Sequence, residues 1–245
     1  MRMMKNIFEW LVEESGRAVC PPAIDDKFFT NGAPRIFPGN TIICPIESKK
    51  DAGLFTVLSE TIDRLKQARF ARSYSFLPLD SLHMTLFEGV LDEVRRPELW
   101  PHDLPLSEPI PAVTDHFMSK LRDLPVEPIF KLRCNGLGLT RSGLQVELEP
   151  ADRFAEVVIR TTRDRLADRL GYRAENHDSY DFHIGLAYLV RWIPFNELQN
   201  LREEVSICTT SLRDKLSVIE LGPARLTRFE MMHRFDPVLT LGRCE

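Results

Sequence analysis

Two short segments of the chain alternate apolar and polar residues, and each carries a histidine at one of its polar positions. The first reads Leu-His-Met-Thr-Leu, and the second, 100 residues later, reads Phe-His-Ile-Gly-Leu. Successive side chains of a β-strand point to opposite faces of a sheet, so both segments predict strands with one apolar core face. His83 and Thr85 would share the other face of the first strand, and His183 and Gly185 would share that face of the second.

Each histidine segment closes a similar order of elements. In the first half, a β-branched run at 41–46 precedes apolar residues at helical spacing over 54–70. In the second half, alternating runs at 130–134 and 144–148 precede helical spacing over 154–170. The order of strand, helix and histidine strand is thus repeated, and a pseudo-twofold axis would bring the two histidine strands side by side. We therefore predict an α+β fold with two lobes whose sheets form a central cleft.

A single bilobal domain is expected over residues 1–245, because a chain of this length can bury an ample core. The first lobe should cover about 36–94 together with strands from the C-terminal part, and the second about 126–192. Five prolines predict an irregular linker at about 95–112. Further expected elements are an amphipathic helix near residue 10, a long loop at 21–40, a helix at 194–214, and strands at 216–221, 224–229 and 238–241.

The two histidine motifs resemble those of the 2H phosphoesterases, the superfamily of LigT-like and cyclic-phosphodiesterase proteins. Its signature is two copies of histidine, an apolar residue, threonine or serine, and another apolar residue. The motif that begins at His83 fits fully, and the motif that begins at His183 fits except for Gly185 at its third position. The resemblance covers about residues 36–195 and points to a poorly characterised branch of the superfamily.

This resemblance implies hydrolysis of a phosphodiester, such as a 2′,3′-cyclic nucleotide or the cyclic-phosphate end of an RNA, without a metal or other cofactor. One histidine would take a proton from water while the other gives a proton to the leaving oxygen, and which does which stays open. Thr85 would donate its hydroxyl hydrogen to a phosphate oxygen. Arg72, Tyr180 and Tyr188 lie near the motifs and are candidates to reach the phosphate, although strand alternation favours a packing role for the two tyrosines.

Gly185 removes the second hydroxyl of the signature and keeps alternatives open. Glycine would make room for a bulkier ligand, with a backbone amide or an arginine replacing the lost donor. Alternatively, the protein binds a nucleotide or an RNA end with weak or no catalysis, or it is a structural protein that keeps only the fold.

The composition narrows the partners and the compartment. The net charge is −4 and no basic tail occurs, which argues against an extended nucleic-acid footprint but not against a small nucleotide or a single RNA terminus. The five cysteines lack Cys-x-x-Cys spacing, so neither a zinc site nor a complete disulfide framework is predicted. No apolar run is long enough for a membrane span or a signal peptide. We expect a cytoplasmic, monomeric protein.

Overall fold

The computed structural model describes residues 7–16, 18–24 and 26–242. The expectations for the first six residues and for Cys244 therefore lie outside the described residues. The described helices are α1 (Ile7–Ser15), α2 (Ala52–Lys66), α3 (Ile110–Leu121), α4 (Arg153–Leu170) and α5 (Leu198–Lys215). The described strands are β1 (Gly39–Pro45), β2 (Tyr74–Phe76), β3 (His83–Leu91), β4 (Phe130–Leu139), β5 (Gly143–Pro150), β6 (His183–Leu189), β7 (Val218–Leu221), β8 (Arg225–Met231) and β9 (Arg234–Thr240).

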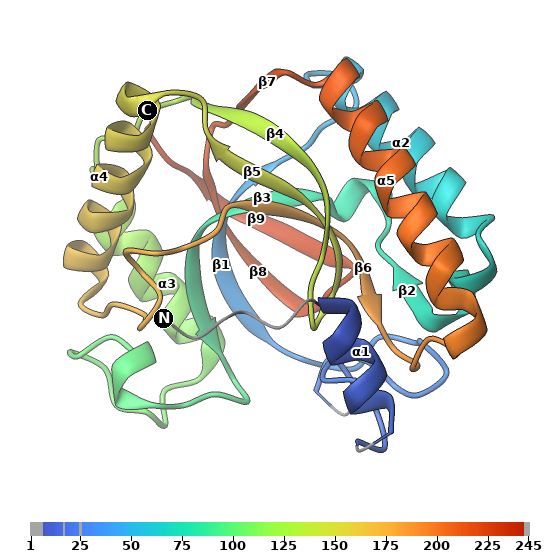
Figure 1. Ribbon diagram of the computed structural model, residues 1–245. Helices are drawn as coiled ribbons and strands as arrows, with labels where there is room; N and C mark the ends of the chain where they lie inside the picture. Colours follow the sequence, from blue (N-terminus) through green and yellow to red (C-terminus); the bar gives the residue numbers. More distant parts are fainter. Residues whose placement is uncertain (1–6, 17, 25, 243–245) are drawn as a thin grey trace.

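These strands form one curled antiparallel sheet (Figure 1). Its order is β7-β4-β5-β6-β3-β1-β8-β9, and β2 pairs with β6 off this path. The order is symmetric about the seam between β6 and β3, because β5 mirrors β1, β4 mirrors β8, and β7 mirrors β9. The units β1-α2-β3 and β5-α4-β6 are equivalent, since in each the helix joins two strands that pair directly. The α+β class is confirmed, and the two histidine strands are neighbours at the middle of the sheet.

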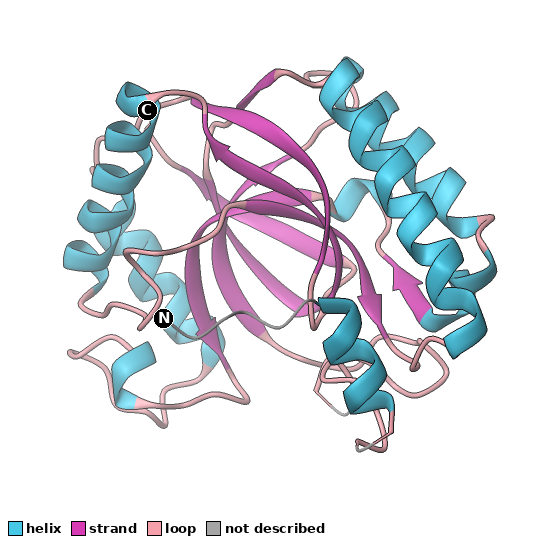
Figure 2. Cartoon of the chain, in the orientation of Figure 1, coloured by secondary structure: helices cyan, strands magenta, loops and turns pink. Residues whose placement is uncertain are grey.

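Four of the described helices lie in two pairs, α3 beside α4 and α2 beside α5, on either side of the curled sheet (Figure 2). Helix α4 begins after Asp152, whose carboxylate accepts a hydrogen bond from the Ala155 amide at 2.8 Å. It ends at Gly171, which adopts a left-handed conformation with φ 79°. Helix α2 buries one apolar stripe at helical spacing, made of Leu54, Leu58, Ile62 and Leu65.

The apolar faces of the two histidine strands lie in the core, as their alternation predicts. Met84, Leu86, Ile184 and Leu186 are all 0% exposed. The two histidines, at the intervening positions, are only partly buried. This confirms that both imidazoles leave the core on the opposite face of the sheet.

Two segments differ from the sequence-based expectation. The linker ends earlier, because α3 occupies its last residues; Pro109 caps this helix and Pro111 lies in its first turn, where no backbone N–H is needed. The C-terminal strands are divided between the halves, since β7 pairs with β4 while β8 pairs with β1.

The described part of the chain contains no helix that is long and apolar enough to cross a membrane. Its cysteines are free thiols, namely Cys20, Cys44, Cys134 and Cys208.

Candidate active site

The two histidine motifs meet at the seam of the sheet, where Met84 of β3 pairs with Ile184 of β6. In this antiparallel register His83, one residue before Met84, lies across from Gly185, and His183, one residue before Ile184, lies across from Thr85. The two histidines are therefore diagonal neighbours on one face, a relation that separates side chains by about 7–8 Å in an antiparallel pair. This spacing suits two groups that bracket a phosphate.

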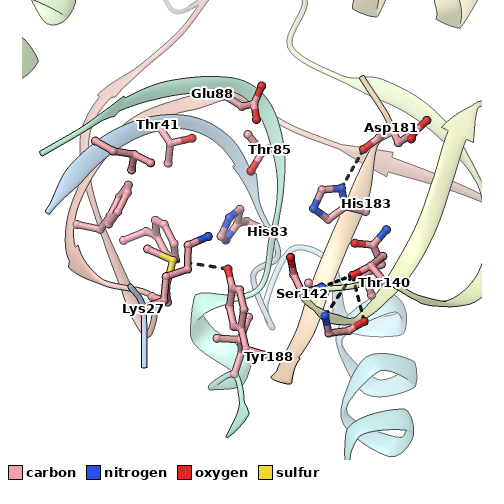
Figure 3. A pocket seen from close by; sticks show the side chains of 18 of the residues that line it. Lys27, Thr41, His83, Thr85, Glu88, Thr140, Ser142, Asp181, His183 and Tyr188 are labelled. Atoms are coloured by element: carbon pink, nitrogen blue, oxygen red, sulfur yellow. Dashed lines mark hydrogen bonds between the residues drawn. The ribbon is translucent and has the colours of Figure 1, made fainter. Parts of the chain in front are cut away.

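Both histidines line a single pocket of about 670 Å³ (Figure 3). Thr85, Gly185 and Tyr180 line the same pocket. Arg72 does not; its guanidinium instead pairs with the carboxylate of Glu197. The structure thus brings together every predicted site residue except Arg72.

The two imidazoles are held in the same way. Nδ1 of His83 lies 2.7 Å from the carbonyl oxygen of Ser81, and Nδ1 of His183 lies 2.9 Å from that of Asp181. A carbonyl oxygen only accepts hydrogen bonds, so in each ring Nδ1 carries the proton and donates it. Each Nε2 is thereby left for the pocket, where it accepts a proton when the ring is neutral and donates one when the ring is charged.

The surroundings of His83 favour its neutral form. Burial, the largest cause, lowers the pKa of His83 to about 4; the nearby His183 adds to the lowering, and the Ser81 carbonyl counteracts it. The ring of Phe235 packs edge-on against His83, with its centroid 4.3 Å from that of the imidazole. A neutral imidazole with a free Nε2 is a proton acceptor at neutral pH.

Tyr180 lines the pocket together with Thr85. Burial, the largest cause, raises the pKa of the Tyr180 phenol, so the phenol keeps its proton, while the Thr85 hydroxyl acts against that rise. The Tyr180 ring stacks on the guanidinium of Arg163 at 4.3 Å. Arg163 donates to the carbonyl oxygens of Leu86 at 2.6 Å and His177 at 3.2 Å. It therefore ties β3 to the segment that leads into β6.

Comparison with known proteins gives a match to a protein family. A family model named 2H-phosphodiest, described as a domain of unknown function (DUF1868), matches residues 27–142, which contain the first histidine motif. The match covers just under half of the chain and agrees with the resemblance of the histidine motifs to the 2H phosphoesterases. A search of curated proteins gives no match.

Several solved structures are similar to this chain. The conserved protein of unknown function ATU0111 from Agrobacterium tumefaciens str. C58 is 29% identical, with a TM-score of 0.87 over 98% of this chain and 100% of that one. It shares the fold over its whole length. Apo LigT from E. coli is 16% identical, with a TM-score of 0.45 over 83% of this chain and 95% of that one. A structure described as a phosphoesterase is 13% identical, with a TM-score of 0.48 over 82% of this chain and 95% of that one.

Gly185 is where this site departs from the superfamily signature. A Cβ atom at this position would meet one neighbour within 4 Å, Cδ1 of Leu77 at 3.7 Å, which is an ordinary contact. At Gly89, in contrast, a Cβ would lie 2.1 Å from the Asn40 carbonyl oxygen. Packing therefore requires glycine at residue 89 but not at residue 185, where the absence of a side chain leaves open space.

The structure places in the pocket two residues that strand alternation assigns to the core face, and one of them, Tyr188, is a candidate already named for its position near the second motif. The pairing of β1 with β3 skips Leu86, and the pairing of β5 with β6 skips Leu186, so each strand has a β-bulge three residues after its histidine. A bulge shifts the alternation by one residue. Glu88 and Tyr188, each five residues after a histidine, consequently line the pocket. Uninterrupted alternation would assign both to the core face.

Glu88 brings an acidic group to this face. Burial, the largest cause, raises its pKa, whereas the charges of Arg163 and His183 and a hydrogen bond with Asn176 act against that rise. Its Oε2 atom is buried and has no hydrogen-bond partner among the described residues. Glu88 therefore carries less negative charge at mildly acidic pH than a solvated glutamate.

Lys27 supplies a positive charge from the loop that precedes β1. Among the described residues that line the pocket, it is the only lysine or arginine. Its ammonium nitrogen lies 5.2 Å from the ring centroid of Tyr188 and 5.5 Å from that of Phe37, and Figure 3 shows it directed into the pocket toward His83. The neighbouring Phe28 is fully buried against Tyr188 and anchors the loop. The sequence gives no periodic signal for such a loop contact.

Metal-ligating side chains gather elsewhere. Within the described residues, one group of three could hold an ion, namely Asp164, His177 and Asp178. None of them lines the pocket, and the guanidinium of Arg173 already pairs with Asp164 and Asp178. The pocket itself is lined by two imidazoles, hydroxyls, amides, one ammonium group and the carboxylates of Glu88 and Asp181.

Proposed function

We propose that the protein hydrolyses a 2′,3′-cyclic nucleotide, or the cyclic-phosphate end of an RNA, through His83 and His183 and without a metal. The observation that carries this proposal is the pair of imidazoles in one pocket, each with Nδ1 engaged by a backbone carbonyl and Nε2 available. General acid–base catalysis needs two such groups on either side of a reacting phosphorus.

The lowered pKa of His83 favours it as the base. In the proposed reaction, Nε2 of His83 takes a proton from water, and the water oxygen forms a bond to phosphorus. The bond between phosphorus and one ribose oxygen breaks, and that oxygen receives the proton of Nε2 of His183. One water is consumed and a phosphomonoester results, after which the two rings exchange protons with solvent. Each proton transfer contributes about 10²–10⁴ in rate.

Charge and size fit such a substrate. Thr85 can donate to one non-bridging phosphate oxygen, and Lys27 brings a positive charge to the anion. The pocket volume of about 670 Å³ lies in the range of small-ligand sites, which is about 300–1,000 Å³. The net charge of −4 suits a compact substrate better than a long nucleic acid.

A second candidate function is binding of the same ligands without turnover, and Gly185 is the observation that favours it. The superfamily signature has a hydroxyl at this position, so the phosphate loses one expected donor. A ligand held with fewer donors would be less activated toward attack.

Hydrolysis of a substrate panel separates the two. Purified protein is incubated with the four 2′,3′-cyclic mononucleotides and with a short RNA ending in a cyclic phosphate, and products are resolved by chromatography. We expect a phosphomonoester product that disappears in both His83→Ala and His183→Ala. Saturable binding without any product would support the binding protein, and neither result would contradict both. We also expect a cytoplasmic monomer, which size-exclusion chromatography with light scattering and subcellular fractionation would test.

A further inference from the structure

Gln145 of β5 lies directly across from Gly185 of β6. On the other side of Gly185, across the seam, lies His83. One row over three strands therefore reads glutamine, glycine, histidine, and both outer members line the pocket. No hydrogen bond joins the Gln145 carboxamide to another described residue, so its N–H donors are free for a ligand.

The corresponding row in the first half has the opposite arrangement. There the motif position is Thr85, which has a hydroxyl, and the residue across from it on β1 is the apolar Ile43. In the second half the motif position is Gly185, which has no side chain, and the residue across from it on β5 is Gln145, which has a carboxamide. Each half thus offers one uncharged donor next to its motif, but in the second half it stands one strand further from the seam.

We propose that the Gln145 carboxamide replaces the missing second hydroxyl and donates a hydrogen bond to a phosphate oxygen lying over Gly185. The space for that oxygen is open, because a side chain at Gly185 would contact only Leu77. Residues directly opposite in an antiparallel pair have Cβ positions about 4.5–5.5 Å apart, a span that a glutamine side chain covers. The phosphate then lies between Gln145 and His83, over the open space that the glycine leaves. This inference rests on the proposed function for the identity of the substrate.

Another hydroxyl on this side of the pocket is already engaged. Thr140 donates to the Gly143 carbonyl oxygen and accepts from the amides of Ser142 and Gly143, so it holds the β4–β5 turn. Gln145 has no such structural duty, which leaves it free to bind a ligand.

The test is a binding titration with inorganic phosphate, followed by nuclear magnetic resonance of the histidine Cε1–H signals. Gln145→Leu should bind phosphate about ten-fold more weakly or worse, because a hydrogen bond to a charged group is lost. Gln145→Glu should bind more weakly still, since it adds repulsion. Gln67→Leu, at the exposed C-terminal end of α2, is the matched control and should bind as the wild type does.

Rescue separates a ligand contact from a structural role. Gly185→Thr restores the hydroxyl of the signature, so the double variant Gln145→Leu/Gly185→Thr should recover most of the lost affinity. Unchanged phosphate binding in Gln145→Leu, or a double variant no better than Gln145→Leu, overturns the assignment. Cyclic-phosphate hydrolysis is measured in parallel. If Gln145→Leu binds phosphate more weakly and the wild type hydrolyses no cyclic phosphate, the role of Gln145 is upheld and the proposed function is rejected. If Gln145→Leu binds phosphate and hydrolyses cyclic phosphate as the wild type does, the proposed function is upheld and the role of Gln145 is rejected.

Discussion

Replacing Phe235 with alanine should raise the pKa of His83. The Phe235 ring covers the imidazole edge-on at 4.3 Å between centroids, and burial is the main reason that the pKa falls from 6.5 to about 4. This difference of about 2.5 units corresponds to a loss of proton affinity on the order of 10²–10³-fold. Admitting water to the ring should raise the pKa of His83 by at least about one unit.

The titration of His83 and the pH dependence of turnover both report this change. In the wild type we expect the acid limb of the kcat/KM profile near pH 4, because the base must be unprotonated. In Phe235→Ala the limb should move toward 6.5, so activity at pH 5 falls while activity at pH 8 changes little. Phe154→Ala serves as the control, since that ring is 78% exposed on α4. A wild-type limb near 6.5, or an unmoved His83 titration in Phe235→Ala, would refute the reasoning.

Three other predictions concern the same pocket. His83→Ala and His183→Ala should each lower turnover by roughly 10²-fold or more, and the double variant should lose less than the product of the two, because acid and base act in one step. Turnover should persist in a strong chelator, since imidazoles make both proton transfers in the proposed reaction; loss in EDTA that a divalent ion restores would indicate metal assistance. Lys27→Met should weaken phosphate binding by about ten-fold and reduce its dependence on salt, whereas Lys27→Arg should retain most of both.

Controls for these variants use residues outside the pocket. Lys131→Met removes an exposed lysine that pairs with Glu220 on the far strands, so it should leave phosphate binding and its salt dependence unchanged. An equal loss in Lys131→Met and Lys27→Met would show that net charge, and not the position of Lys27, governs binding. Circular dichroism melting of each variant checks that the fold is retained.

Local periodicity predicted the elements that carry the histidines, because a strand with one buried face has a two-residue repeat that survives in the sequence. It also placed Met84 and Ile184 in the core. It failed where an inserted residue shifts that repeat, so the bulges at Leu86 and Leu186 concealed Glu88 from the prediction and gave Tyr188 the wrong face.

Tertiary contacts account for the remaining differences. Lys27 reaches the pocket from a loop with no repeat, held by the burial of Phe28. Arg72 is close to the first motif in sequence, but its guanidinium is directed to Glu197. Pro109 and Pro111 break a helix in general and start one here, because both stand at its first positions.

The candidate active site lies on the seam that the two halves share, so it is intact only while the halves are associated. His83 and His183 come from different halves, and their strands are aligned there through the pair Met84 and Ile184. Arg163 of α4 donates a hydrogen bond to the Leu86 carbonyl oxygen of β3 from the other side. Parting the halves would carry the two imidazoles away from each other while leaving each half its own helix and strands. Under the proposed mechanism, catalysis would then cease before most secondary structure is lost, and neither half would be active alone, since neither contains both histidines.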